Sequence, residues 1–241
     1  MITEYTTHSA ITDFKNHGEY QLLENITGHL NVIFDVGCNI GEWSRMARSL
    51  HPSALIHMFE IAPITFQKLL RNNVIDEGMI PNSFGLSSKT QEIPIRYVPD
   101  NDRVTTAVLK MYHENSHIKT GVVVNPMTYM KNYDCETIDF LKLDTEGHEF
   151  DVLQGFTPIL EQGNIKIIMF EYGYANIPNK HLLMDYYQLL EPFGYVIGKL
   201  YPDGVDFQEY KLYHEDFKGP NYVAVHKSQQ EIIHKIKKGT I

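Results

Sequence analysis

The chain has 241 residues, a formal net charge of −9, 43% hydrophobic and 21% charged residues, and two cysteines, Cys38 and Cys135. This length and composition suit one substantial globular domain with room for an extension or an insert. The acidic balance excludes a nucleic-acid backbone as the main partner, because phosphate binding needs a basic face. With too few cysteines for a disulfide framework and no apolar run long enough for a membrane span, we expect a reduced, cytoplasmic protein.

The first predicted unit is a strand, a glycine turn and a helix. An apolar run over about 31–36 contains Asp35. Two glycines, Gly37 and Gly41, come after it, and helical spacing then continues to about residue 50. This order predicts the start of a βαβ unit. A dinucleotide site favours G-x-G-x-x-G, but Asn39 stands at the second glycine position. An acid beside the turn also suits a cationic ligand better than a pyrophosphate, which favours S-adenosylmethionine (SAM).

The next predicted strand covers about 54–60 and also ends in an acid, Glu60. An acid at the tip of the second strand of a doubly wound sheet accepts hydrogen bonds from ribose hydroxyls. Glu60 is therefore the predicted ribose ligand. A helix over about 62–73 follows, and then come a short strand and turn at 82–87 in the third-strand position and an exposed strand at 91–97.

The least regular part of the chain is about 99–131, which contains His113, His117 and a strand-like run at 121–124. A segment of this length between core strands is usually a functional lid or insert. We expect it to lie near the active site.

The second half of the chain continues the alternation of strands and helices. Two apolar strands, at about 138–144 and 165–171, end in Asp144 and Glu171. Further predicted elements are helices at 149–155 and 181–192 and closing strands at 193–197 and 222–226. The pattern predicts an α/β protein with a mostly parallel, doubly wound Rossmann-like sheet. We divide the chain into an N-terminal helical extension (1–30), one domain (31–230) and a basic C-terminal tail (231–241).

Four of the predicted strands end in carboxylates: Asp35, Glu60, Asp144 and Glu171. In an open parallel sheet the ligand binds outside the carboxyl ends of the strands, so these acids should converge on one rim. The densest cluster runs from Lys142 to Glu149. Within it a glycine permits a tight turn, and Glu149 falls in the first helical turn, where an acid is favoured.

Three blocks of the sequence resemble the FkbM-type SAM-dependent methyltransferases. They are Phe34–Gly41, Phe59-Glu60 and Phe140–Gly155, and the last contains the complete family hallmark Lys-x-Asp-x-Glu-Gly-x-Glu. The resemblance covers roughly residues 30–226 and implies a class I methyltransferase fold with an antiparallel last strand.

The resemblance also implies roles for residues. Those expected to bind SAM, with S-adenosylhomocysteine as the product, are Asp35, Gly37, Asn39, Gly41, Glu60, Gly85, Leu86, Ser87 and Asp144. Those expected near the acceptor are Lys142, Glu171, Tyr172, Tyr174 and His113.

Methylation of a hydroxyl requires a base, for which the candidates are Asp144, Glu146 and His148, with His113 and His117 as alternatives. Asp144, Glu146 and Glu171 are also hard oxygen donors, but no dedicated metal motif is present, so no metal is predicted.

The main functional prediction is an O-methyltransferase acting on a sugar hydroxyl of a surface glycan or its activated precursor, where the sugar is implied only by the resemblance. The alternatives are a natural-product hydroxyl or a nitrogen acceptor, a nicotinamide-dependent oxidoreductase, and a non-catalytic binding module. The polar composition of the 99–131 segment favours a polar acceptor. The oligomeric state, a homodimer included, stays open.

Overall fold

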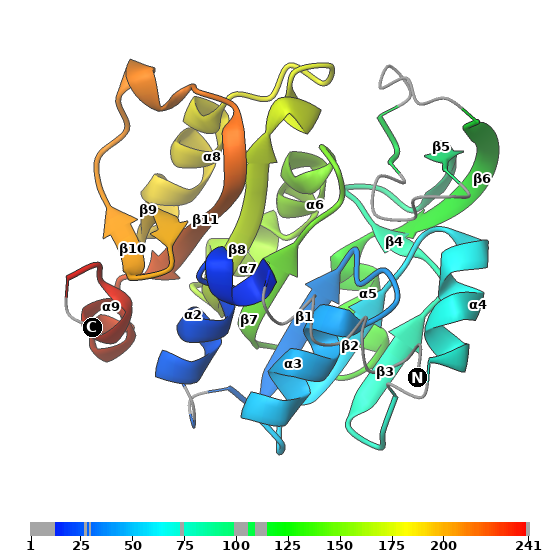
Figure 1. Ribbon diagram of the computed structural model, residues 1–241, viewed down its shortest axis with the longest axis horizontal. Helices are drawn as coiled ribbons and strands as arrows, with labels where there is room; N and C mark the ends of the chain where they lie inside the picture. The colour runs from blue at the N-terminus through cyan, green and yellow to red at the C-terminus, as the bar shows by residue number, and fades with distance from the viewer. Residues whose placement is uncertain are drawn as a thin grey trace.

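The computed structural model describes residues 13–26, 28, 30–72, 75–98, 106–108 and 115–239. Helices cover both faces of a central sheet (Figure 1). Its eight strands are β1 (Val32–Val36), β2 (Leu55–Phe59), β3 (Met79–Asn82), β7 (Ile138–Leu143), β8 (Ile165–Gly173), β9 (Tyr195–Tyr201), β10 (Gly204–Phe207) and β11 (Lys218–His226).

Each face of the sheet has its own hydrophobic core. On one face pack α2 (Glu19–Asn25), α3 (Glu42–Leu50), α4 (Pro63–Arg71) and α9 (Gln230–Ile236). On the other pack α5 (Pro126–Asn132), α6 (Glu149–Gly155), α7 (Thr157–Leu160) and α8 (Leu183–Leu190). All six residues of β7 are buried, as expected for a parallel strand covered on both faces.

The strand order is β10-β9-β11-β8-β7-β1-β2-β3. Neighbours from β3 to β8 are parallel, while β11 runs antiparallel between β8 and β9. The predicted Rossmann-like α/β fold with an antiparallel last strand is therefore confirmed. The unpredicted β10 adds an antiparallel hairpin at the edge. Because β1, β2, β7 and β8 are parallel, their carboxyl ends meet at one edge of the sheet.

A second, three-stranded sheet has the order β4-β6-β5, from β4 (Gly85–Leu86), β5 (Gln91–Tyr97) and β6 (His117–Val124). The third strand of the main sheet is β3 and not the predicted 82–87 segment, because Gly85 and Leu86 pair with β6 instead. The expected irregular segment at about 99–131 is also partly regular. It contains β6 and most of α5, which begins where the Asn125 side chain accepts hydrogen bonds from two backbone N–H groups.

The described ends of the chain are part of the packed structure. Leu22 and Leu23 of α2 and Ile232 and Ile236 of α9 are buried in the same core. The segment 231–241, expected as a basic tail, contains most of α9. This helix has an apolar face, since Ile232 and Ile236 are four positions apart and lie on one side of it. Among the described residues, no helix has the length and apolar character needed to cross a bilayer.

Candidate functional site

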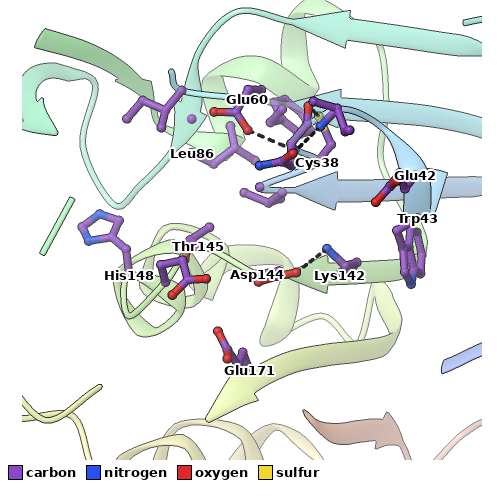
Figure 2. Close-up of a pocket in the computed structure, with 18 of the residues that line it drawn as sticks. Cys38, Glu42, Trp43, Glu60, Leu86, Lys142, Asp144, Thr145, His148 and Glu171 are labelled. Atoms are coloured by element: carbon purple, nitrogen blue, oxygen red, sulfur yellow. Dashed lines mark hydrogen bonds and ion pairs between the residues drawn. The ribbon is translucent and has the colours of Figure 1, made fainter. Parts of the chain in front are cut away.

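A cavity of about 370 Å³ opens at the carboxyl edge of the main sheet, a volume in the range of small-molecule sites. Figure 2 shows its wall, with Glu60 and Leu86 in the upper half of the view and Asp144 and Glu171 in the lower half. The predicted site residues that line it are Gly37, Asn39, Glu60, Gly85, Leu86, Lys142, Asp144, Glu146, His148 and Glu171. The prediction that the strand-end acids converge on one rim is correct for three of the four.

Gly37 allows two strand ends to approach each other closely. It follows β1 with φ +83°, and a Cβ placed there would lie 1.8 Å from the backbone oxygen of Asp144. Its N–H donates to the carbonyl oxygen of Phe59 at 2.9 Å. Only glycine satisfies both the backbone angle and the contact. The tips of β1, β2 and β7 are thereby held together around the cavity.

Asn39 replaces the second glycine of a dinucleotide loop, yet it keeps the backbone angle a glycine would adopt, with φ +52°. Asparagine is one of the few residues that visits this region routinely. Its N–H donates to Oε2 of Glu60 at 3.0 Å, and the N–H of Ala62 donates to Oε1 at 2.7 Å. Glu60 is thus oriented by two backbone groups. A carboxylate oxygen accepts more than one hydrogen bond, so this anchoring is compatible with an added ribose hydroxyl.

The side of the cavity next to Glu60 is apolar. Ile61, Leu86 and Val123 line it, and they come from the end of β2 and from the second sheet. A Cβ at Gly121 would lie 2.5 Å from Cγ1 of Ile61, so the glycine lets β6 pack directly against that side chain. Ile61 and Val123 were not predicted, because their role depends on the pairing of β4 with β6.

Lys142 links the cavity to the buried interior of the sheet. Its Nζ lies 3.1 Å from Oδ1 of Asp35 and 3.0 Å from Oδ2 of Asp144, and its side chain is only 5% exposed. Burial alone would lower the pKa of Lys142, but the charges of Asp144 and Asp35 raise it, so the lysine stays protonated. Asp144 is consequently held at the cavity wall by a fixed cation.

Asp35 does not line the cavity, contrary to its predicted contact with the cofactor. It belongs to β1 itself, where it is paired in register with Lys142 of β7 and is fully buried. Its second oxygen accepts a hydrogen bond from Oγ of Ser44 at 2.6 Å. Neighbouring strands present register partners on the same face, which explains why the acid meets the lysine and not the ligand. Asp35 therefore holds Lys142, which lines the cavity, without lining the cavity itself.

The turn between β7 and α6 is strained, and it presents Glu146. Glu146 has φ +55° and Gly147 has φ +97°, and a Cβ at Gly147 would meet the carbonyl oxygen of Ala175 at 2.3 Å. Oε1 of Glu149 accepts hydrogen bonds from the N–H groups of Thr145 and Gly147, at 2.7 and 3.2 Å. Glu149 lies in the first turn of α6, as predicted, and its carboxylate holds the preceding turn in place.

Three acids gather at the lower wall of the cavity. Asp144, Glu146 and Glu171 each bring a carboxylate oxygen within 4.8 Å of the other two. Burial, with the charges of Asp144 and Glu149, raises the pKa of Glu146 to about 8. Burial, with the charge of Asp144 foremost among its neighbours, raises the pKa of Glu171 to about 10. The set can hold protons near neutral pH, and its hard oxygen donors also suit a divalent cation. The absence of a metal stays a prediction.

His148 lines the cavity, but both of its ring nitrogens have protein partners. Nδ1 lies 3.2 Å from Oδ2 of Asp151, and Nε2 lies 3.1 Å from Oγ of Ser87. Burial lowers the pKa of His148, although Asp151 opposes the shift. A histidine engaged on both sides is less available as a base than Glu146, which faces the cavity.

Several predicted residues lie outside the cavity wall. Gly41 is the N-cap of α3, with φ +84°, and Ser87 is buried beside His148. Tyr174 is 58% exposed, and partial burial of its hydroxyl, together with the charges of Glu146 and Glu171, raises its pKa. His117 begins β6 on an exposed stretch. His113 lies outside the described residues.

Tyr172 does not reach the cavity, contrary to its predicted contact with substrate. The strand β8 continues to Gly173, beyond the predicted end, and successive side chains of a strand point to opposite faces. Glu171 therefore lines the cavity while Tyr172 is fully buried on the other face, where its hydroxyl donates to Glu215.

The cavity also has walls that no motif indicated. These are mainly the N-terminal residues Asp13, Phe14, His17 and Glu19, the α3 residues Glu42 and Trp43, and Asn221 of β11. These residues reach the cavity through packing between parts of the chain that are distant in sequence, and residue spacing does not predict such packing.

Comparison with known proteins agrees with the motif-based resemblance. The family described as methyltransferase FkbM domain matches residues 35–197. The chain is similar to methyltransferase sdnD of Sordaria araneosa, with 29% identity over 51% of this chain and 59% of that protein. It is similar to the hexuronic acid methyltransferase AglP of Haloferax volcanii, with 29% identity over 59% of this chain and 57% of that protein. The match thus spans less than two thirds of the length of either relative.

Among solved structures, methyltransferase FkbM from Methylobacillus flagellatus shares the fold, with a TM-score of 0.52 and 14% identity. That match covers 82% of this chain and 44% of the other.

Proposed function

Since the chain belongs to the FkbM methyltransferase family, we propose that it is a SAM-dependent O-methyltransferase acting on a sugar hydroxyl of a surface glycan or its activated precursor. One observation carries this proposal. A single cavity joins the anchored carboxylate Glu60 and the apolar Leu86 to a cluster of acids at the ends of β7 and β8.

The cavity residues suit SAM in each of its parts. Glu60 is oriented to accept from ribose hydroxyls, while Ile61, Leu86 and Val123 offer apolar contact to an adenine. Asp144 provides a negative charge on the wall for the cationic part of the ligand. When bound, the cofactor supplies a methyl group on a positively charged sulfur.

We assign proton removal to Glu146. With SAM held in the cavity as the methyl donor, the carboxylate of Glu146 would accept the proton that the acceptor hydroxyl loses on methylation. Burial raises the pKa of Glu146 to about 8, close to the value at which a base is effective near neutral pH. A positioned base of this kind contributes about 10²–10⁴-fold to the rate. The remaining acids and Lys142 hold the geometry in which oxygen, methyl and sulfur align.

Two observations support a sugar as acceptor. The cavity wall around Glu146 is polar, with Thr145, His148 and Glu171 beside it. One similar protein is named as a hexuronic acid methyltransferase. Sugars present several hydroxyls, which polar side chains of this kind can orient.

The first experiment is calorimetric titration of the protein with SAM and S-adenosylhomocysteine. We expect the wild type to bind both ligands and Glu60→Ala to lose at least tenfold in affinity (about 1.4 kcal/mol). The affinity of Glu161→Ala should equal that of the wild type, because the exposed carboxylate of Glu161 lies outside the cavity. Absence of binding by the wild type would refute the proposal.

Candidate acceptors are then incubated with the protein and SAM, and their methylation is detected by mass spectrometry. Uronic acids, neutral sugars and nucleotide sugars form one panel. Natural-product phenols and amines form a second panel. Methylation confined to the second panel would retain the cofactor assignment and refute the sugar.

A further inference from the structure

The cofactor cavity is closed on one side by a residue outside the family-matched region, which covers residues 35–197. Glu19, the first residue of α2, is 7% exposed and lines the cavity. An acid is rarely buried to this extent unless it is paired or serves a function.

Only one of the two carboxylate oxygens of Glu19 has a protein partner. Oε1 accepts a hydrogen bond from Nδ2 of Asn221 at 3.0 Å, and Asn221 comes from β11, 202 positions away. Oε2 is buried and has no hydrogen-bond partner among the described residues. Leaving such an acceptor unsatisfied is unfavourable, and more so if it is charged. The arrangement therefore calls for a donor supplied by a ligand.

The charges around Glu19 indicate what kind of donor this is. Burial raises the pKa of Glu19 to about 7, and the nearby carboxylates of Asp144 and Asp35 add to the rise, while Lys142 opposes it. Lys142 is the one lysine or arginine that lines the described cavity, and it already contacts both aspartates. Three carboxylates thus share one cation. A second positive charge at Oε2 would correct this imbalance.

The position of Glu19 matches the far end of an elongated ligand. In Figure 2, Glu60 and Leu86 lie on one side of the cavity, and Lys142 and Trp43 lie together on another. Nζ of Lys142 is 5.5 Å from the centre of the Trp43 ring. Glu19 contacts Asn221, the register partner of Glu171, so it lies at the β8 and β11 end of the cavity, away from Glu60 at the end of β2.

We propose that Glu19 binds the α-ammonium group of the amino-acid portion of SAM through Oε2, with Asn221 orienting the carboxylate. This inference deepens the proposed function and rests on it. It adds α2 and β11 to the cofactor site, neither of which lies in the family-matched region.

The test compares S-adenosylhomocysteine with its deaminated analogue, in which hydrogen replaces the α-amino group. A charge-assisted hydrogen bond contributes about 1.5–3 kcal/mol, which corresponds to roughly 10–150-fold in Kd. We expect wild-type protein to prefer the amino compound by that factor. In Glu19→Gln the preference should vanish, while the affinity for the deaminated analogue changes by less than about threefold (under 0.7 kcal/mol).

The matched control is Glu24→Gln, the same substitution at an exposed position of the same helix, which should keep the wild-type preference. Equal binding of the two ligands by the wild type would overturn the role of Glu19 and leave the proposed function standing, and this comparison needs no variant. A uniform loss of both ligands in Glu19→Gln would also overturn it, since it would indicate a structural role. Absence of any binding by the wild type would overturn the proposed function as well.

Discussion

Replacing Lys142 by methionine should destabilise the fold strongly, because it leaves a buried charge without its partner. The Lys142–Asp35 pair is 3.1 Å long, with the two side chains 5% and 0% exposed. At an effective dielectric constant of about 20, the attraction at this distance is about 5 kcal/mol. Much of it offsets desolvation, but removing one partner of such a pair costs about 3–5 kcal/mol.

The cost is measurable by urea unfolding and by calorimetry. For a chain of this length, about 3–5 kcal/mol corresponds to a fall in Tm of roughly 6–20 °C. The control is Lys235→Met, which breaks an exposed pair with Glu231 four positions away and should cost at most about 0.5 kcal/mol. Adding Asp35→Asn to Lys142→Met should recover at least about 2 kcal/mol, since the uncompensated charge is then removed.

A loss below about 1 kcal/mol in Lys142→Met would refute this reasoning, because it is the size expected of a surface pair. Failure of Asp35→Asn to rescue the variant would show that lost packing, and not an unpaired charge, is responsible.

Three further predictions concern the loop, the base and the acids. Gly37→Ala should lower the free energy of unfolding, measured in urea, by about 2 kcal/mol or more, since backbone strain of about 1–2 kcal/mol adds to a contact with the backbone of Asp144. The control is Gly28→Ala, where φ is +87° and no atom lies within 4 Å of the added Cβ, so that only the strain is expected. Equal losses in the two variants would contradict the role of the contact. The methylation rate should rise with pH up to about 8, because Glu146 must be deprotonated to accept a proton, and Glu146→Gln should lower kcat about 10²–10⁴-fold while cofactor affinity is retained; a kcat close to that of the wild type would exclude this base. Treatment with EDTA should leave the rate unchanged if the acids hold protons, whereas loss of activity restored by Mg²⁺ or Mn²⁺ would identify Asp144, Glu146 and Glu171 as a metal site.

The parts of the fold that depend on local pattern were predictable. Runs such as Ile138–Leu143 and Ile165–Gly173 are mostly apolar, and they form the central parallel strands. Helix α5 also had a local signal that was overlooked, because Asn125 caps it and Pro126 occupies the first helical position. The second sheet had no such signal, since alternation along β5 indicates a strand but not its partner.

The site was predictable where residues follow a strand end and less so elsewhere. Glu60 and Asp144 follow their strands directly and reach the cavity. Asp35 and Tyr172 belong to strands, so the alternation of side chains decides which face they occupy, and a shift of one residue reverses the outcome. Glu19 and Asn221 were missed because 202 positions separate them, and only the completed sheet brings them together.

The position of β11 also determines when the cavity wall is completed during synthesis of the chain. This strand inserts between β8 and β9, and the residue that holds Glu19 lies near its start. A ribosome-bound chain that has emerged only to the end of β9 therefore has an open sheet and an unfinished cavity wall. A stop codon shortly before residue 218 would remove an interior strand and not an edge. Cofactor binding by a nascent chain would accordingly report that the segment through β11 has left the ribosome.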